Sequence, residues 1–263
     1  MIPGKNAAPS AYTTGQRRGR CGLHWKGKLL WSLWAAALVL SAAALLVSSP
    51  AAETAGTTPV KGYLALTFDD GPWPETTGAL LDGLARRGVK ATFFLIGSQV
   101  EGQEDTLRRM CEEGHQLGLH TWDHTSLRGR SAGEIGFQLT RTREAVERIT
   151  GPADFMLRPP YGFVDETLTA CAGMPIIGWS VDTEDWRDPS VPRIVQAAVD
   201  GAEDGAILLL HDTFDTSVTA ALEIVDRLMA EGYYFVTVEQ LFALHHVTPE
   251  NGQVYLRGKG ETP

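Results

Sequence analysis

Residues 63–72 read YLALTFDDGP and change abruptly from apolar to acidic side chains. The short apolar run at residues 63–68, bounded by turn-forming residues, is typical of a buried strand. Asp69 and Asp70 follow it, and the dipeptide Gly71-Pro72 indicates a turn. This stretch therefore predicts a strand that ends on two adjacent carboxylates.

The same pattern, an apolar run followed by a segment of helical period, recurs along the chain. Strands are expected at residues 63–68, 91–96, 116–119, 155–157, 175–179, 207–210 and 234–238. Helices are expected at residues 74–87, 104–113, 131–149, 166–171, 191–201, 218–230 and 238–244. Ser131 and Glu134 have the spacing of a capping box. Alternating strands and helices predict an α/β domain, a barrel of about seven parallel strands with helices outside.

Five clusters of polar residues directly follow expected strands. They are Asp69-Asp70, residues 120–124 (HTWDH), residues 158–161 (RPPY), residues 182–186 (DTEDW) and His211-Asp212. Barrels carry their chemistry at the carboxyl ends of the strands. We therefore expect these clusters to meet at one mouth.

The residues at this mouth have the chemistry of a metal site. His120 and His124 are four residues apart, so both rings can reach one ion from a helix or a tight loop. With Asp70 they form a set of two imidazoles and one carboxylate that leaves coordination positions open. Open positions on a divalent ion are what hydrolytic catalysis requires, so the sequence predicts a hydrolase.

Two further groups are candidates for proton transfer. Asp69 is next to the expected ligand Asp70 but points in a different direction, so its carboxylate can face a water. His211 ends an expected strand, and either Asp182 or Asp185 can supply a carboxylate beside it. Such a carboxylate raises the pKa of an imidazole and keeps it a usable acid near neutral pH.

The ordered motifs of the chain resemble those of the NodB-type polysaccharide deacetylases, carbohydrate esterase family 4. They are residues 67–72 (TFDDGP), 120–124 (HTWDH), 158–162 (RPPYG), 182–186 (DTEDW) and 209–212 (LLHD), within residues 60–245. The resemblance implies a distorted (β/α) barrel and one divalent metal ion, usually Zn²⁺, with Co²⁺ or Ni²⁺ as possible substitutes. Leu119 departs from the family, which often has Asn before the first metal-binding histidine.

The resemblance also implies roles for the residues around the metal. It assigns the metal ligands to Asp70, His120 and His124 and the general base to Asp69. It gives Arg158 the task of orienting that base.

For the leaving group, the resemblance implies that His211 is the general acid and that Asp185 adjusts the pKa of its imidazole. The backbone N–H of Tyr161 is implied to form part of the oxyanion hole. Trp186 and Leu209 are implied to line the pocket for the acetyl methyl group.

These roles imply an enzyme that removes N-acetyl groups from amino sugars of an extracytoplasmic polysaccharide and releases acetate. Peptidoglycan is the first expectation, since the expected location is next to the cell wall. Chitooligosaccharide and O-acetyl-xylan are the alternatives on the same site. A third alternative, of another class, is a membrane-tethered glycan-binding protein that has lost activity. No obligate protein partner is evident.

A candidate membrane-targeting segment precedes the expected domain. Residues 29–47 are 19 consecutive uncharged residues, long enough to nearly span a bilayer as one transmembrane helix. The basic residues before it place the rest of the chain outside the membrane. The segment is either a signal anchor, which we favour because it exceeds the about 7–15 apolar residues of a signal peptide, or a cleaved signal peptide of a secreted protein.

The chain thus divides into a cytoplasmic basic tail (1–28), the apolar segment (29–47), a linker (48–61), the deacetylase-like domain (62–247) and a frayed C-terminal tail (248–263). Residues 1–28 hold six of the 23 basic residues and no acidic one, which leaves 17 basic against 32 acidic residues beyond them. A surface this acidic repels phosphate backbones, so nucleic acid is excluded as a partner of the domain.

Overall fold

The computed structural model describes residues 59–260. The basic tail, the expected transmembrane helix and most of the expected linker lie outside these residues. Among the helices between residues 59 and 260, none combines the length and the hydropathy of a bilayer-spanning segment.

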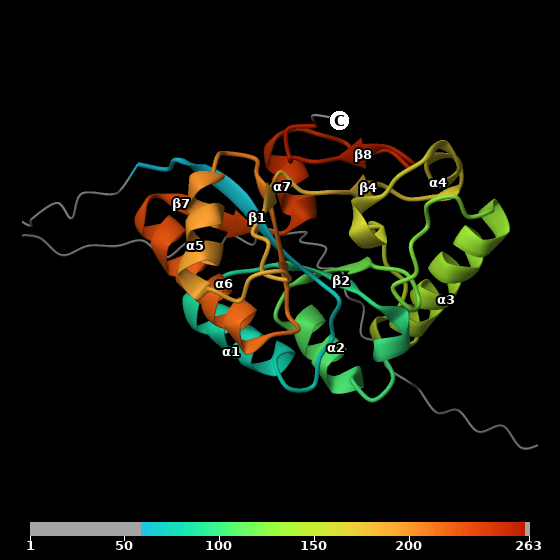
Figure 1. Cartoon of the computed structure of the whole chain (residues 1–263), viewed down its shortest axis with the longest axis horizontal. Helices are drawn as coiled ribbons and strands as arrows, with labels where there is room; N and C mark the ends of the chain where they lie inside the picture. The colour runs from blue at the N-terminus through green and yellow to red at the C-terminus, as the bar shows by residue number, and fades with distance from the viewer. Residues whose placement is uncertain (1–58, 261–263) are drawn as a thin grey trace, which may run out of the picture.

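The central strand β1 (Gly62–Asp69) organises the sheet, and every strand that pairs with it is parallel to it. On one side it pairs with β6 (Ile207–His211) along residues 65–69. On the other side β7 (Tyr233–Val236) pairs with its first half and β2 (Thr92–Leu95) with its second half. β1 therefore crosses the middle of the molecule, as Figure 1 shows.

The remaining strands bend the sheet into a distorted ring. β3 (Gln116–Leu119) follows β2, and single bridges connect Leu119 to Leu157 and Leu157 to β4 (Ile176–Ile177). β5 (Val181–Asp182) pairs with β6 from the other end. The expected strand at 155–157 is thus reduced to a bridge, and the region expected as one strand at 175–179 gives β4, with β5 following after a break. These parallel strands bear out the expected α/β class.

The side chains of β1 alternate between the interior of the ring and the outer layer of helices. Leu64, Leu66 and Phe68 join the large apolar cluster, whereas Ala65 joins a smaller cluster formed by residues of other strands and of the helix at residues 238–244. Successive side chains of a strand point to opposite faces, so Thr67 and Asp69 share the inner face with Ala65. The interior is therefore apolar at one end and polar at the carboxyl end.

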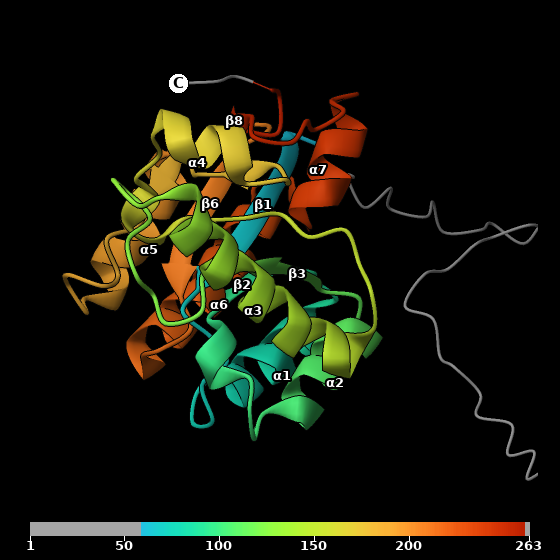
Figure 2. The ribbon, with the colours of Figure 1, turned by 90° about the vertical axis from the view of Figure 1, so that its right-hand side faces the viewer.

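Helices cover the outside of the sheet, as the two views in Figures 1 and 2 show. Their bounds are close to those expected: α1 (Thr77–Arg87), α2 (Glu104–Glu112), α3 (Ala132–Thr150), α4 (Glu166–Cys171), α5 (Val191–Asp200), α6 (Asp215–Ala230) and α7 (Val238–Leu244). The capping box at α3 is confirmed, because Ser131 accepts from the backbone of Glu134 and the Glu134 side chain accepts in return. Two short 3₁₀ turns, Gly97–Gln99 and Pro160–Gly162, lie in loops after strands.

The stretch after Thr248 departs from the prediction of a frayed tail. It contributes β8 (Val254–Tyr255), which pairs with β4, and the side chain of Tyr255 is only 5% exposed. The Gly258 N–H also donates to the Gly205 carbonyl. The prediction was wrong for residues 248–260 because their one apolar run, residues 254–256, is too short to form a recognisable strand.

Candidate active site

The candidate catalytic residues lie at the carboxyl ends of adjacent strands. Asp69 is the last residue of β1 and His211 the last of β6, and the two residues are direct partners in the register. His120 follows the last residue of β3. Pairing of these strands therefore gathers residues that are far apart in the sequence at one end of the ring, as expected for barrels.

Asp70, His120 and His124 form a compact group of potential metal ligands. Their ligand atoms all lie within 4.8 Å of one another. Oδ1 of Asp70 is 3.4 Å from Nε2 of His120 and 3.3 Å from Nε2 of His124. Within residues 59–260 this buried oxygen has no hydrogen-bond partner, which leaves an acceptor aimed at the space between the two rings. The geometry fits one divalent ion.

The protonation states of these groups suit a cation. Burial alone would raise the pKa of Asp70, but the imidazoles of His120, His211 and His124 lower it below its usual range. Burial, aided by the charge of a neighbouring imidazole, lowers the pKa of His124 although Asp70 opposes this. Nδ1 of His120 lies 2.7 Å from the carbonyl oxygen of Arg158, so this nitrogen donates and Nε2 keeps its lone pair.

Two of the candidate ligands have a positive φ, a backbone conformation that L-residues rarely adopt. Asp70 has φ of 73° and His124 of 61°, and Thr121 between the histidines has 64°. The N–H groups of Gly97 and Ser98 donate to the carbonyls of Thr121 and Trp122 and hold this loop. Such left-handed conformations cost free energy and persist where surrounding contacts impose them. The fold thus fixes the directions of the ligands.

Arg158 holds Asp69 from inside the ring. Its side chain is fully buried, and Nη1 donates to Oδ1 of Asp69 at 2.8 Å and to Oγ1 of Thr67 at 2.7 Å. Nη2 donates to the carbonyl of Gly178 at 2.8 Å, and Nε to that of Ile177 at 3.2 Å. Residues i and i+2 of a strand share a face, which is why one guanidinium reaches both Thr67 and Asp69. Oδ2 of Asp69 remains directed toward the metal-ligand group.

Asp185 orients His211 on the opposite side. Its Oδ1 lies 2.8 Å from Nδ1 of His211, and its Oδ2 accepts from the His211 backbone N–H at 2.8 Å. Burial would lower the pKa of His211, but the hydrogen bond and charge of Asp185, with the charges of Asp69 and Asp70, raise it to about 9. Of the two carboxylates expected as partners, the structure selects Asp185; Asp182 instead accepts from the backbone of Glu184.

A cavity of about 440 Å³ joins these groups to the surface. Tyr161, Trp186 and Leu209 line it together with the ligand residues, Asp69 and His211. Leu209 is buried, whereas Trp186 and Tyr161 are exposed at the rim. All ten residues named from the sequence therefore converge on one site, with Arg158 and Asp185 behind the cavity wall.

The structure adds contacts that sequence reasoning had not assigned. Trp179, the last residue of an expected strand, lines the cavity, and so does Asp182, which belongs to a cluster expected at the mouth. Asp212 is buried behind the site, where burial and the charge of Asp70 raise its pKa to about 7 although a hydrogen bond from Thr77 opposes this. A Cβ atom at Gly71 would lie 2.6 Å from Oδ2 of Asp212, so this turn needs glycine. These contacts join distant segments, so no local pattern signals them.

Comparison with known proteins finds similar proteins that are named as deacetylases. The family model described as polysaccharide deacetylase matches residues 56–174. The peptidoglycan-N-acetylglucosamine deacetylase PgdA of Listeria monocytogenes serotype 1/2a (strain 10403S) is 43% identical over 179 residues, which are 68% of this chain and 38% of that protein. This chain therefore spans well under half the length of that relative.

Two further similar proteins are matched over a larger share of their own length. A peptidoglycan-N-acetylglucosamine deacetylase of Bacillus cereus (strain ATCC 14579) is 37% identical over 189 residues, 69% of each chain. The crystal structure of the Xyl-CE4 domain of a multidomain xylanase, from the hindgut metagenome of Trinervitermes trinervoides, superposes with a TM-score of 0.72 at 35% identity. That match covers 76% of this chain and 100% of the domain.

Proposed function

Because this chain belongs to the polysaccharide deacetylase family, we propose that it is a metal-dependent hydrolase that removes N-acetyl groups from amino sugars of an extracytoplasmic glycan. The observation that carries the proposal is the group of Asp70, His120 and His124, with Asp69 and His211 beside it in one cavity. A metal-ligand set, a carboxylate and an imidazole that share one cavity support amide hydrolysis.

Asp70, His120 and His124 would hold the ion, for which we propose Zn²⁺, with Co²⁺ or Ni²⁺ as substitutes. A divalent ion supplies Lewis-acid polarisation of a carbonyl oxygen and a lowered pKa of water. The chain's part is to keep one carboxylate ionised and two imidazole nitrogens unprotonated toward the same point. The Arg158 carbonyl does this for His120 by fixing the proton on Nδ1.

Asp69 acts as the general base. Its Oδ1 is held by Arg158, so Oδ2 is the atom that takes a proton from the attacking water. The guanidinium keeps the carboxylate in one orientation throughout the reaction. Water then adds to the acetamide carbonyl carbon.

Tyr161 and His211 complete the reaction. The backbone N–H of Tyr161, set in a turn with φ of 63°, donates to the oxygen that gains negative charge. Nδ1 of His211 is engaged by Asp185, so Nε2 faces the cavity and gives its proton to the departing nitrogen. Protonation lets the amine leave, and the products are acetate and a free amino sugar.

Peptidoglycan is the substrate we propose. Two of the relatives are named peptidoglycan-N-acetylglucosamine deacetylases, and the apolar segment at residues 29–47 would place the domain outside the membrane, next to the wall. Chitooligosaccharide and O-acetyl-xylan are alternatives on the same site, and similarity to a domain of a xylanase supports testing the latter. Fractionation with N-terminal sequencing tests location: we expect membrane-bound protein, and a soluble product beginning near Ala52 would contradict an anchor.

Acetate release from purified peptidoglycan, chitin oligomers and acetylxylan tests the function. We expect release from peptidoglycan with zinc-loaded protein, loss of release in chelator, and recovery with zinc or cobalt. Activity that persists in strong chelator would contradict a metal-dependent reaction. Retention of glycan without acetate release from metal-loaded protein would instead favour an inactive binding protein.

A further inference from the structure

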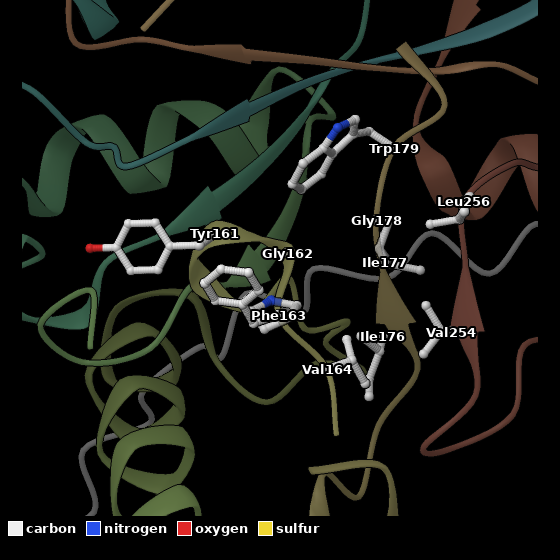
Figure 3. Close-up of a pocket in the computed structure, with 11 residues that line it drawn as sticks. Tyr161, Gly162, Phe163, Val164, Ile176, Ile177, Gly178, Trp179, Val254 and Leu256 are labelled. Atoms are coloured by element: carbon white, nitrogen blue, oxygen red, sulfur yellow. The ribbon is translucent and has the colours of Figure 1, made fainter. Parts of the chain in front are cut away.

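Two exposed aromatic residues at the rim of the catalytic cavity are held in different ways. Tyr161 has ring contacts: its centroid lies 4.8 Å from that of His124 and 6.1 Å from that of Phe163, which shares its loop in Figure 3. Trp186 is 55% exposed, and within residues 59–260 its indole has no hydrogen bond and no ring contact. The position of Trp186 therefore depends on the loop that carries it.

This loop, residues 183–190, connects β5 to α5 and is called the β5–α5 loop below. Contacts with β6 fix its first residues. Oγ1 of Thr183 donates to the carbonyl of Leu209 at 2.9 Å, and the carboxylate of Asp185 binds His211 as described above. These contacts end one residue before Trp186, so the rest of the loop needs other support.

Glu184 closes a turn around Trp186. Its carbonyl accepts from the N–H of Arg187 at 3.0 Å and from that of Asp188 at 3.1 Å. Its φ of 53° is a left-handed conformation, which costs free energy and persists where other contacts impose it. One such contact is local, since Nη1 of Arg187 donates to Oε1 of Glu184 at 3.1 Å.

Arg193 of α5 bridges the two ends of this turn. Its Nη2 donates to Oε2 of Glu184, and its Nη1 donates to Oδ2 of Asp188 at 3.2 Å. The next residue, Ile194, is buried, which anchors this part of α5 in the core. One guanidinium thus ties both sides of the turn that contains Trp186 to the body of the domain.

The bridge is suited to fixing geometry more than to adding stability. The side chains of Arg193, Glu184 and Asp188 are between 34% and 44% exposed, and ion pairs this exposed contribute little to stability. A guanidinium is planar, however, and its donors fix the relative positions of two carboxylates. None of the three residues lines the catalytic cavity, whereas Trp186 between them does.

We propose that Arg193, by bridging Glu184 and Asp188, is a positioning residue that holds Trp186 at the rim of the catalytic cavity for glycan binding. The proposal rests on the proposed function, since it requires a substrate in that cavity. Asp185 is held separately by His211, so loss of the bridge leaves the proton donor in place. A loss of binding that is equal in the ground state and the transition state raises KM and leaves kcat unchanged.

Arg193→Gln tests the proposal in the zinc-loaded full chain, with the glycan from which wild-type protein releases most acetate. We expect KM to rise about threefold to tenfold and kcat to stay within about twofold of the wild-type value. Arg87→Gln is the matched control, because Arg87 donates to Asp226 at 2.6 and 2.7 Å between α1 and α6, outside the β5–α5 loop. KM of this variant should equal that of wild-type protein.

Two further measurements show whether the effect passes through the turn. The N–H groups of Arg187 and Asp188 should exchange with solvent about tenfold faster in Arg193→Gln than in wild-type protein or Arg87→Gln, as followed by nuclear magnetic resonance. Glu184→Gln should also raise KM. Because both changes remove the same contact, the double variant should raise KM little more than the larger single effect.

The outcomes separate this inference from the function on which it rests. An unchanged KM in Arg193→Gln, an equal rise in Arg87→Gln, or a fall in kcat alone would overturn the role of Arg193 and leave the deacetylase function intact. Unchanged amide exchange at Arg187 and Asp188, or KM effects that multiply in the double variant, would also overturn it. Absence of acetate release by wild-type protein from every glycan offered would overturn the function itself.

Discussion

Two carboxylates adjacent in the sequence, Asp69 and Asp70, have different partners and therefore different roles. Asp69 lies on the strand and receives the buried guanidinium of Arg158, whereas Asp70 turns out of the strand with φ of 73° toward two imidazoles. Backbone direction at one residue thus separates a proton acceptor from a metal ligand. This difference can be tested by substitution.

We predict that Asp69→Asn retains metal but lowers kcat by about 10²–10⁴-fold, the scale of losing a general base. His120→Ala should lose both metal and turnover because it removes one of the ligands. Metal content after dialysis and acetate release measure the two properties separately. An Asp69→Asn protein with a near-normal rate would refute the assignment of the base.

A second residue-scale prediction concerns His211 and pH. Its pKa in the folded, metal-free protein is raised from 6.5 to about 9, so the interaction stabilises the fold fully below pH 6.5 and is lost as pH rises through about 9. In Asp185→Asn we expect the pKa to fall toward or below 6.5. Nuclear magnetic resonance titration of the imidazole measures it. A pKa that stays near 9 in the variant would show that Asp185 is not the cause.

At the scale of elements, α3 positions the loop that carries both histidine ligands. Gln138 accepts from the Trp122 N–H at 2.7 Å and donates to Oδ1 of Asp123 at 3.0 Å, so one side chain spans residues between His120 and His124. This loop also contains the left-handed residues described above. Its geometry therefore depends on a residue outside every motif.

Gln138→Leu should weaken zinc or cobalt binding by about 10–100-fold, as expected when a residue that orients ligands is lost. Gln196→Leu is the matched control, because Gln196 on α5 bonds to Asp200 of its own helix. Competition with a chelator gives both dissociation constants. Equal affinities in the two variants would rule out this role of Gln138.

The β8 segment gives the second prediction at this scale. Tyr255 is 5% exposed and packs edge-on against Phe242, with 5.1 Å between ring centroids, whereas Tyr234 is 49% exposed. Tyr255→Ala should therefore lower the free energy of unfolding by about 3–5 kcal/mol, and Tyr234→Ala by much less. Urea denaturation measures both. A negligible loss for Tyr255→Ala would restore the interpretation of these residues as a frayed tail.

At the scale of the whole molecule, local patterns predicted the elements well and the closure of the ring poorly. Helix bounds such as those of α4 and α7 follow from caps and apolar spacing, which are local. The two-residue strands β4, β5 and β8 are too short for any periodic signal, and pairing partners define them. The same distinction explains why the ten motif residues were found from the sequence, whereas Gln138 and the buried contact between Asp212 and Thr77 were not.

The account as a whole depends on one divalent ion held by Asp70, His120 and His124. Anomalous scattering from crystals grown with zinc, recorded on both sides of the zinc absorption edge, tests this most directly. We predict one strong peak within coordination distance of an oxygen of Asp70 and of Nε2 of His120 and His124. A zinc peak bound elsewhere, with none between these three side chains, would contradict the account.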